Sequence, residues 1–344
     1  MLAARIVVTM RAVLCDSYGG PEVLELVDDL PVPQPGPNGI LVRVQACSVN
    51  PVDWKLRAGM LAPLWKLRFP VIWGCDFSGV VEEVGRAVTL FKPGDEVYGF
   101  KHGKVAQTYR GTYSEYVVVP ENTAARKPAT LSHEEAASIP LAAVTAWQAM
   151  VEQGKLAAGQ KVLIHAAAGG VGVMAVQIAK AMGAHVVATC SPANQDFLRE
   201  LGADEVIDYT RDKIEDKLSG YDVVLDGVGK SVWASSLKVL KRGGRLVTLS
   251  LPIPDPPAGK IAFFGTIVAN VAVNTVSGMF RGKRLMTTQV KPRGGDLEKV
   301  SALIEAGKLR PVVAKVYPLE QIADAHRESE KGHVRGKLVV RVSR

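Results

Sequence analysis

A glycine-rich turn between an apolar run and a helical pattern is the segment of this chain best suited to bind a phosphate group. The apolar run is Lys161–His165, and the turn is Ala166–Gly172. Glycines let the backbone turn tightly and approach a pyrophosphate, and free N–H groups at the start of the next helix meet its negative charge. We therefore expect a dinucleotide to bind along Ala168, Gly169, Gly170, Val171 and Gly172.

The end of the next apolar run bears on which dinucleotide this would be. The segment Ala188–Pro192 contains no acidic residue, whereas an enzyme that uses NAD usually carries Asp or Glu here for the ribose hydroxyls. A carboxylate would repel a 2′-phosphate, and Ser191 offers a hydroxyl instead. The sequence therefore favours NADPH, with Arg199 as a further candidate contact. The alternative is that Ser191 only caps the helix that begins near Asn194.

Two kinds of pattern divide the chain into two predicted domains. Up to about residue 135, β-branched runs such as Ile40–Ser48 are separated by Gly- and Pro-rich turns, which predicts a mostly antiparallel β-domain. Further on, apolar runs alternate with helical stretches, as in a parallel sheet covered on both faces. The last helix and strands are expected to return to the first domain. We predict an α/β protein with one domain at 10–135 and 294–344 and a doubly wound parallel-sheet domain at 136–293.

The composition restricts the kinds of partner and compartment. The 344 residues carry a net charge of +8, with basic residues concentrated between Pro256 and Gly295. No nucleic-acid module surrounds them, so we predict that the chain binds no nucleic acid. Four scattered cysteines without a CxxC pair predict free thiols in a reducing compartment. Met1–Thr9 is too short for a secretory signal, and we expect a cytoplasmic or organelle-soluble protein (chloroplast or mitochondrion) that is not secreted.

Several motifs resemble those of the quinone-oxidoreductase branch of the medium-chain dehydrogenase/reductase superfamily, and the resemblance covers nearly the whole chain. They are Ser48–Lys55 (SVNPVDWK), Gly74–Val81 (GCDFSGVV), Phe91–Val97 (FKPGDEV), Gly169–Gly172, Leu201–Asp204 and Gly332–Lys337 (GHVRGK). The first of these, together with Ala188–Cys190, is especially similar to the chloroplast-envelope quinone-oxidoreductase homologues. Mitochondrial reticulon-interacting oxidoreductases are similar in the same segments. The resemblance implies a GroES-like first domain and a Rossmann second domain.

The resemblance also implies cofactor contacts that the residues alone do not establish. Ala168, Gly170 and Val171 would hold the pyrophosphate, Ser191 and Tyr209 the adenosine end, and Asn50 would lie near the nicotinamide ribose. His333, Arg335 and Gly336 would close over the cofactor from the returning tail. Taken alone, Tyr209 is more often an aromatic residue at a strand end, and His333 and Arg335 would ordinarily be solvated.

Three positions argue against a catalytic zinc ion. The zinc alcohol dehydrogenases of this superfamily have Cys where Asn50 stands, a His-Glu pair where Cys75 and Asp76 stand, and a third ligand near Leu141. A catalytic zinc needs three protein ligands and an open position. Only Cys75 could serve here, so we predict no metal site.

Without a Lewis acid, the suitable hydride acceptors are those that delocalise the incoming charge themselves, namely quinones and α,β-unsaturated carbonyl compounds. We predict that Lys55 binds the acceptor oxygen or steadies the enolate, and that Asp53 orients Lys55 or the backbone around it. The alternative for Lys55 is a solvated surface lysine. Aromatic residues between Trp54 and Trp73 could line the acceptor pocket, or simply cover a core.

Other functions and partners remain open at this point. A reductase of lipid-derived alkenals or γ-ketols is the runner-up, and a cofactor-binding scaffold protein with little turnover is the alternative from another class. A strand at Leu285–Val290 would be a sheet edge, so we expect a homodimer, which sedimentation would test. The uncharged run Ile261–Phe280 is expected to pack at a cleft or dimer interface. The basic residues near it leave peripheral contact with an anionic membrane as an alternative, testable by liposome flotation at rising salt.

Overall fold

The computed structural model describes residues 8–62, 67–101, 110–250, 265, 267–269, 271–273, 275–276, 279 and 282–343. The chain forms two compact units, and the first consists of Met1–Leu141, Pro292–Ser301 and Val313–Arg344. The second consists of Ala142–Lys291 and Ala302–Val312. Residues 302–312, which the sequence analysis assigns to the first domain, group with the second unit, and residues 136–141 group with the first.

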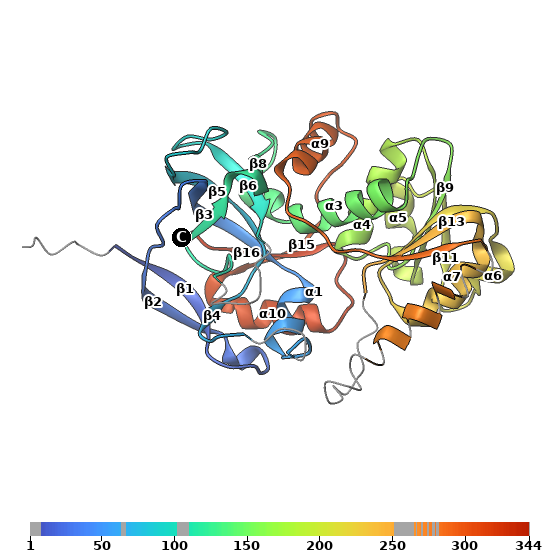
Figure 1. Ribbon diagram of the computed structural model, residues 1–344, viewed down its shortest axis with the longest axis horizontal. Helices are drawn as coiled ribbons and strands as arrows, with labels where there is room; N and C mark the ends of the chain where they lie inside the picture. Colours follow the sequence, from blue (N-terminus) through green and yellow to red (C-terminus); the bar gives the residue numbers. More distant parts are fainter. Residues whose placement is uncertain are drawn as a thin grey trace, which may run out of the picture. The chain divides into compact units, whose positions relative to one another are not determined.

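The described part of the first unit contains two sheets (Figure 1). The larger has the strand order β15-β16-β3-β5-β6-β8, with β7 also paired to β3, and the smaller has the order β2-β1-β4. All pairs are antiparallel except β15 with β16. The strands are β1 (Thr9–Cys15), β2 (Glu25–Pro31), β3 (Gly39–Val49), β4 (Val71–Ile72), β5 (Asp76–Val84), β6 (Glu96–Phe100), β7 (Tyr116–Pro120), β8 (Ala124–Arg126), β15 (Val313–Pro318) and β16 (Lys337–Arg341). The expected mostly antiparallel first domain is therefore present, and its last strands come from the C-terminal tail.

Helices cover this unit, and its core is built from alternate strand residues. The helices are α1 (Pro51–Arg57), α2 (His133–Ala137), α3 (Pro140–Trp147, whose last residues belong to the second unit), α9 (Gly294–Glu305, which also ends in the second unit) and α10 (Ile322–Glu330), with single turns η1 (Pro21–Val23), η2 (Glu121–Thr123) and η6 (Leu319–Gln321). Ile40, Val42 and Val44 of β3 point into one core with Phe77 and Trp73. Residues two apart lie on one face of a strand, so these three side chains of β3 face the same core.

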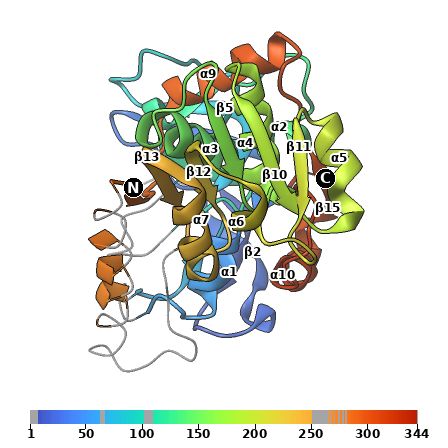
Figure 2. The ribbon, with the colours of Figure 1, turned by 90° about the vertical axis from the view of Figure 1, so that its right-hand side faces the viewer.

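The second unit is a six-stranded parallel sheet in the order β11-β10-β9-β12-β13-β14. Figure 2 shows β13, β12, β10 and β11 in this order across the sheet. The strands are β9 (Lys161–Ile164), β10 (His185–Cys190), β11 (Glu205–Asp208), β12 (Tyr221–Asp226), β13 (Leu240–Thr248) and β14 (Arg284–Thr287). Strand order 3-2-1-4-5-6 is that of a dinucleotide-binding Rossmann domain, in which ligands bind beyond the carboxyl ends of the strands.

The elements between these strands include α4 (Gly170–Ala181), α5 (Gln195–Glu200), α6 (Ile214–Lys217), α7 (Trp233–Val239), η3 (Gln148–Gln153), η4 (Pro192–Asn194) and η5 (Lys230–Val232). The edge strand β14 ends at Thr287, before the end of the expected Leu285–Val290. The N–H of Thr288 still donates to the carbonyl of Thr248 at 3.0 Å, and further on the N–H of Lys291 donates to Gln148 Oε1 at 2.9 Å. A homodimer through this edge stays a prediction.

Most of the apolar run Ile261–Phe280 lies outside the described residues. Its described residues are helical, and Val268, Val273 and Met279 among them are exposed, whereas Val271 packs against the core of the second unit. Among the helices that the structure describes, none has both the length and the apolarity that a membrane crossing requires.

Candidate active site and cofactor-binding residues

The glycine-rich turn connects β9 to α4 in the second unit and brings Ala168–Gly172 together at a helix start. Ala166 adopts a φ of 51°, and the N–H of Gly169 donates to its carbonyl at 3.0 Å, which closes the turn. A Cβ on Gly172 would lie 2.4 Å from the carbonyl oxygen of Ala166. Only glycine therefore lets α4 start this close to the turn, and the first N–H groups of the helix remain available for an anion. The turn fits the pyrophosphate of a dinucleotide.

A buried histidine that the sequence analysis did not single out holds the strand ends beside this turn. His165 Nδ1 lies 3.1 Å from Thr189 Oγ1 of β10, and Nε2 lies 3.1 Å from Ser236 Oγ of α7. Burial lowers the pKa of His165 to about 4, so the ring is neutral at physiological pH. A histidine at the end of an apolar run carries no sequence signal for such a role.

Ser191 and Tyr209 follow directly after the paired strand ends of β10 and β11. Cys190 pairs with Asp208 in the parallel register, and the N–H of Tyr209 lies 3.4 Å from the carbonyl of Cys190. The Tyr209 side chain is 58% exposed, which leaves it free to contact a ligand. The Ser191 hydroxyl makes no helix-capping hydrogen bond and accepts one from Asn194 Nδ2 at 3.3 Å. The structure thus brings the two predicted adenosine contacts to neighbouring positions.

Two charged residues near these strand ends bear on the expected binding of the 2′-phosphate. Arg199 donates to Asp196 and Gln195 of its own helix α5, so its guanidinium has partners there already. The second is Asp208, for which no sequence motif indicates a role. It accepts the N–H and the hydroxyl of Thr210 at 2.9 and 2.6 Å, and these bonds lower its pKa. A negative charge is therefore present one strand beyond Ser191.

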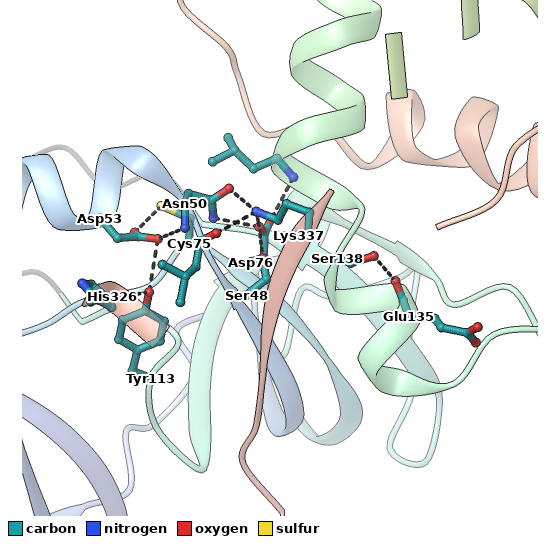
Figure 3. A network of polar contacts seen from close by, with 12 residues as sticks. Ser48, Asn50, Asp53, Cys75, Asp76, Tyr113, Glu135, Ser138, His326 and Lys337 are labelled. Carbon is teal, nitrogen blue, oxygen red and sulfur yellow. Dashed lines mark hydrogen bonds and ion pairs between the residues drawn. The ribbon is translucent and has the colours of Figure 1, made fainter. Parts of the chain in front are cut away.

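In the first unit, Asn50 and Asp53 belong to a buried network of polar side chains (Figure 3). Asn50 follows β3 directly and precedes α1, and Asp53 lies in the first turn of α1, where its Oδ2 accepts the backbone N–H of Asn50 at 2.8 Å. Asp53 also accepts from Tyr113 Oη and Cys75 Sγ, each at 3.3 Å. Of the two roles predicted for Asp53, the contacts support orientation of the backbone; the structure gives no bond between Asp53 and Lys55. Burial raises the pKa of Asp53 to about 6.

A chain of hydrogen bonds leads from Asp53 to the end of α10. Arg57 Nη1 can only donate, so it donates to His326 Nδ1 at 3.2 Å, and the ring proton is then on Nε2, 3.1 Å from Tyr113 Oη. Tyr113 in turn donates to Asp53, and Arg57 is paired with Glu330 at 2.5 Å. Burial, reinforced by Arg57, lowers the pKa of His326 to about 3. The network therefore holds a neutral histidine between an arginine and a carboxyl group.

These pKa values predict how stability changes with pH. The folded pKa of His326 and of His165 lies below the usual 6.5, so each favours the folded state at neutral pH and its contribution is lost as the pH falls below 6.5. Asp53 acts oppositely, because its raised pKa favours the folded state as the pH falls from about 6 to 4. The two histidines outweigh Asp53, and the free energy of unfolding should be about 2 kcal/mol lower at pH 5 than at pH 7. Urea titrations at both pH values should show this loss shrink to below about 1 kcal/mol in His326→Gln, and an unchanged loss would contradict the assignment.

Asp76, at the start of β5, joins the end of β3 to the C-terminal strand. Its Oδ2 accepts from Ser48 Oγ at 2.5 Å and from Asn50 Nδ2 at 2.8 Å, and lies 3.4 Å from Lys337 Nζ. Its Oδ1 accepts the N–H of Leu141 at 2.7 Å. The side chains of Asp76 and Lys337 are almost completely buried. Neither residue was predicted as part of the site.

The residues at the positions of the zinc ligands are therefore hydrogen-bonded to one another or to Asp53. Asn50 and Leu141 donate to Asp76, and Cys75 donates to Asp53. Within the described ranges, no group of three or more His, Cys, Asp and Glu side chains is arranged to hold a metal ion. These residues do not fit a catalytic zinc, and zinc independence stays a prediction.

Lys55 lies on α1, half-buried, with Nζ 5.4 Å from the centre of the Trp54 ring. Burial lowers the pKa of Lys55. In the part of the chain that the structure describes, no acceptor binds its ammonium group. The aromatic cluster is divided: Trp73 lies in the core with Phe69 packed against it, and Trp65 is outside the described residues. Trp73 and Phe69 thus cover a core.

The tail residues His333, Arg335 and Gly336 connect α10 to β16, and Gly336 has a φ of 75°. His333 and Arg335 are exposed. They belong to the first unit, and the turn at Ala168–Gly172 belongs to the second, so the structure brings together each group but does not place one against the other.

Comparisons with known proteins match both parts of the chain. Residues 36–129 match the family model described as alcohol dehydrogenase GroES-like domain, and residues 201–340 match the one described as zinc-binding dehydrogenase. The mitochondrial NAD(P)H oxidoreductase RTN4IP1 of Mus musculus is 37% identical over 97% of this chain and 89% of its own length. The chloroplastic NADPH-dependent alkenal/one oxidoreductase of Arabidopsis thaliana is 35% identical over 96% of this chain and 79% of its own.

The solved structure of the quinone oxidoreductase from Coxiella burnetii has a TM-score of 0.83 and 34% identity, covering 98% of this chain and all of that one. With the GroES-like and Rossmann architecture and the phosphate-binding turn, these similarities show that the chain belongs to the quinone-oxidoreductase branch of the medium-chain dehydrogenase/reductase superfamily and is an oxidoreductase that uses a nicotinamide cofactor.

Proposed function

We propose that this oxidoreductase transfers hydride from NADPH to quinones or α,β-unsaturated carbonyl compounds without a metal ion. The observation that carries the proposal is how the polar side chains around Asn50 are hydrogen-bonded. Asp53, Cys75 and Asp76 are bonded within the protein, and Asn50 is bonded to Asp76. Lys55, on α1 like Asp53, keeps an ammonium group that no described acceptor binds. The site thus offers a hydrogen-bond donor for a developing oxyanion, in place of a metal.

The residues of the chain have distinct tasks in this reaction. The nicotinamide, when bound, supplies the hydride. The turn at Ala168–Gly172 binds its pyrophosphate, and Ser191 and Tyr209 hold the adenosine end. Hydride addition at the β-carbon of an enone moves an electron pair onto the carbonyl oxygen, where the Lys55 ammonium stabilises the negative charge by donating a hydrogen bond. Lys55 or water then supplies the proton that completes the reduced product, so that each acceptor takes up one hydride and one proton.

A narrower substrate class is the second candidate. The Arabidopsis relative is called an alkenal/one oxidoreductase, and lipid-derived alkenals and γ-ketols contain or resemble the same conjugated carbonyl group. Steady-state rates on a quinone, an enone, an alkenal and a γ-ketol, each with NADPH and NADH, test the proposal and rank the two candidates. Tight NADPH binding with no turnover on any of them would indicate a cofactor-binding scaffold protein instead.

The choice of NADPH over NADH makes a separate prediction at Ser191. Ser191→Asp introduces a carboxylate beside the expected 2′-phosphate, and the Asp208 carboxylate is already one strand away. We expect the dissociation constant for NADPH to rise about tenfold or more, because like charges repel at short range, while that for NADH changes little. Fluorescence titration of both nucleotides measures this. Ser219→Asp, at an exposed position of the same unit, is the matched control. Equal effects on both nucleotides would contradict the assignment of Ser191.

A further inference from the structure

Lys337 is a buried lysine whose ammonium group is bound entirely within the first unit. It begins β16, immediately after the tail residues His333–Gly336, and its side chain is only 5% exposed. Nζ donates to the carbonyl of Val49 at 3.1 Å and to Asn50 Oδ1 at 2.5 Å, and lies 3.4 Å from Asp76 Oδ2. An ammonium buried this deeply is retained only with such partners, because removal from water is costly.

These contacts fix which way the amide of Asn50 faces. Its oxygen accepts a hydrogen bond from Lys337. Its nitrogen Nδ2 donates one to Asp76 Oδ2 at 2.8 Å. A flipped amide would place the NH2 group against the ammonium and the oxygen against the carboxylate. Both contacts would change from attractive to repulsive, so the two charges hold the amide in a single orientation.

One hydrogen-bond donor of Asn50 remains in this orientation. The nitrogen carries two protons, and among the described residues only Asp76 accepts from it. The oxygen has no comparable freedom, because Lys337 is bound to it. Asn50 can therefore donate a hydrogen bond to a ligand but has little capacity to accept one. The group it recognises must be an acceptor, such as a ribose hydroxyl or carboxamide oxygen of the nicotinamide half of the cofactor.

We propose that Lys337 is a positioning residue that, with Asp76, sets Asn50 as a hydrogen-bond donor to an oxygen atom of the bound nicotinamide nucleotide. This rests on the proposed function, with Asn50 near the nicotinamide ribose as the family resemblance implies. Lys337 acts through Asn50 and touches neither cofactor nor substrate. The same lysine ties the tail at His333–Gly336 to the end of β3, so the two sets of expected cofactor contacts in the first unit share one anchor.

A double-mutant cycle tests the connection. The full-length chain is prepared as the wild type, Lys337→Met, Asn50→Ala and the double variant, and the dissociation constant for NADPH is measured by titration. Each single substitution should raise it about tenfold, the effect of one lost hydrogen bond, and the double variant should be no weaker than the singles. Lys127→Met is the matched control, because Lys127 is an equally buried lysine bound to the carbonyl of Leu131 and should leave NADPH affinity unchanged.

The outcomes separate the inference from the function it rests on. Single effects that multiply to about a hundredfold in the double variant, or a Lys337→Met variant that binds NADPH like the wild type, would overturn the role of Lys337. A wild-type chain that binds no NADPH would instead overturn the proposed function. If Lys337→Met does not fold, Asn50→Asp decides: it keeps an acceptor for Lys337 but has no amide proton to donate. It should lose NADPH affinity as Asn50→Ala does, and retained affinity would show that Asn50 is not a donor.

Discussion

Lys55→Met should lower kcat for an enone acceptor about a hundredfold while leaving the dissociation constant for NADPH unchanged. The substitution removes the ammonium that stabilises the developing oxyanion, and methionine keeps an unbranched apolar side chain at this half-buried position. Stopped-flow oxidation of NADPH at saturating acceptor measures the loss. Since burial lowers the pKa of Lys55, the wild-type rate should also fall as the pH rises through a value below the usual 10.5, and Lys55→Arg should move this fall to higher pH.

Lys92→Met provides the control for loss of a positive charge, because Lys92 is exposed in a turn of the same unit. A Lys55→Met enzyme with wild-type kcat would show that Lys55 is a solvated lysine without a catalytic role. An equal decline of kcat and of NADPH affinity would instead point to a distorted α1.

The second large effect is expected at Gly172, where Gly172→Val should weaken NADPH binding a hundredfold or more, about 3 kcal/mol. Any Cβ at this position would lie 2.4 Å from the carbonyl of Ala166 and 2.5 Å from that of Ala167. The start of α4 must then move away from the turn, and its N–H groups no longer converge on the pyrophosphate. Titration with NADPH, alongside circular dichroism to verify folding, measures the effect.

Gly295→Val is the matched control, because Gly295 is also in the first turn of a helix and nothing lies within 4 Å of a Cβ built there. If Gly172→Val does not fold, Gly172→Ala presents the same close approach with a smaller side chain. NADPH binding that is unchanged in both variants would mean that the nucleotide is bound elsewhere.

Local patterns in the sequence predict the phosphate-binding turn and the class of fold because they depend on neighbours along the chain. The turn at Ala166–Gly172 needs residues that can bend and approach a backbone closely, and only a few residue types can do so. The alternation of apolar runs and helices likewise reports a covered parallel sheet. The strand β14 ends before its apolar run does, and the chain beyond it bonds to the distant Gln148. Contacts between residues so far apart leave no local pattern in the sequence.

The polar network around Asn50 was only partly predictable, because its partners are far apart in the sequence. Arg57 and His326 are 269 positions apart, and Asn50 and Lys337 are 287 apart. The motif at Ser48–Lys55 identified Asn50, Asp53 and Lys55, but no periodicity marks Tyr113, His326 or Lys337 as buried. A single polar residue in an apolar stretch indicates that a partner must exist and does not say which residue it is.

The route of the chain through the larger sheet has a consequence for biosynthesis. Strand β16 pairs with β3, and it leaves the ribosome after every residue of the second unit has been made. The nascent first unit therefore lacks β15, α10 and β16 while the parallel sheet of the second is already complete, and it exposes an unpaired flank of β3 during that time. Lys337 and His326 reach their buried partners only after the whole second unit has been synthesised.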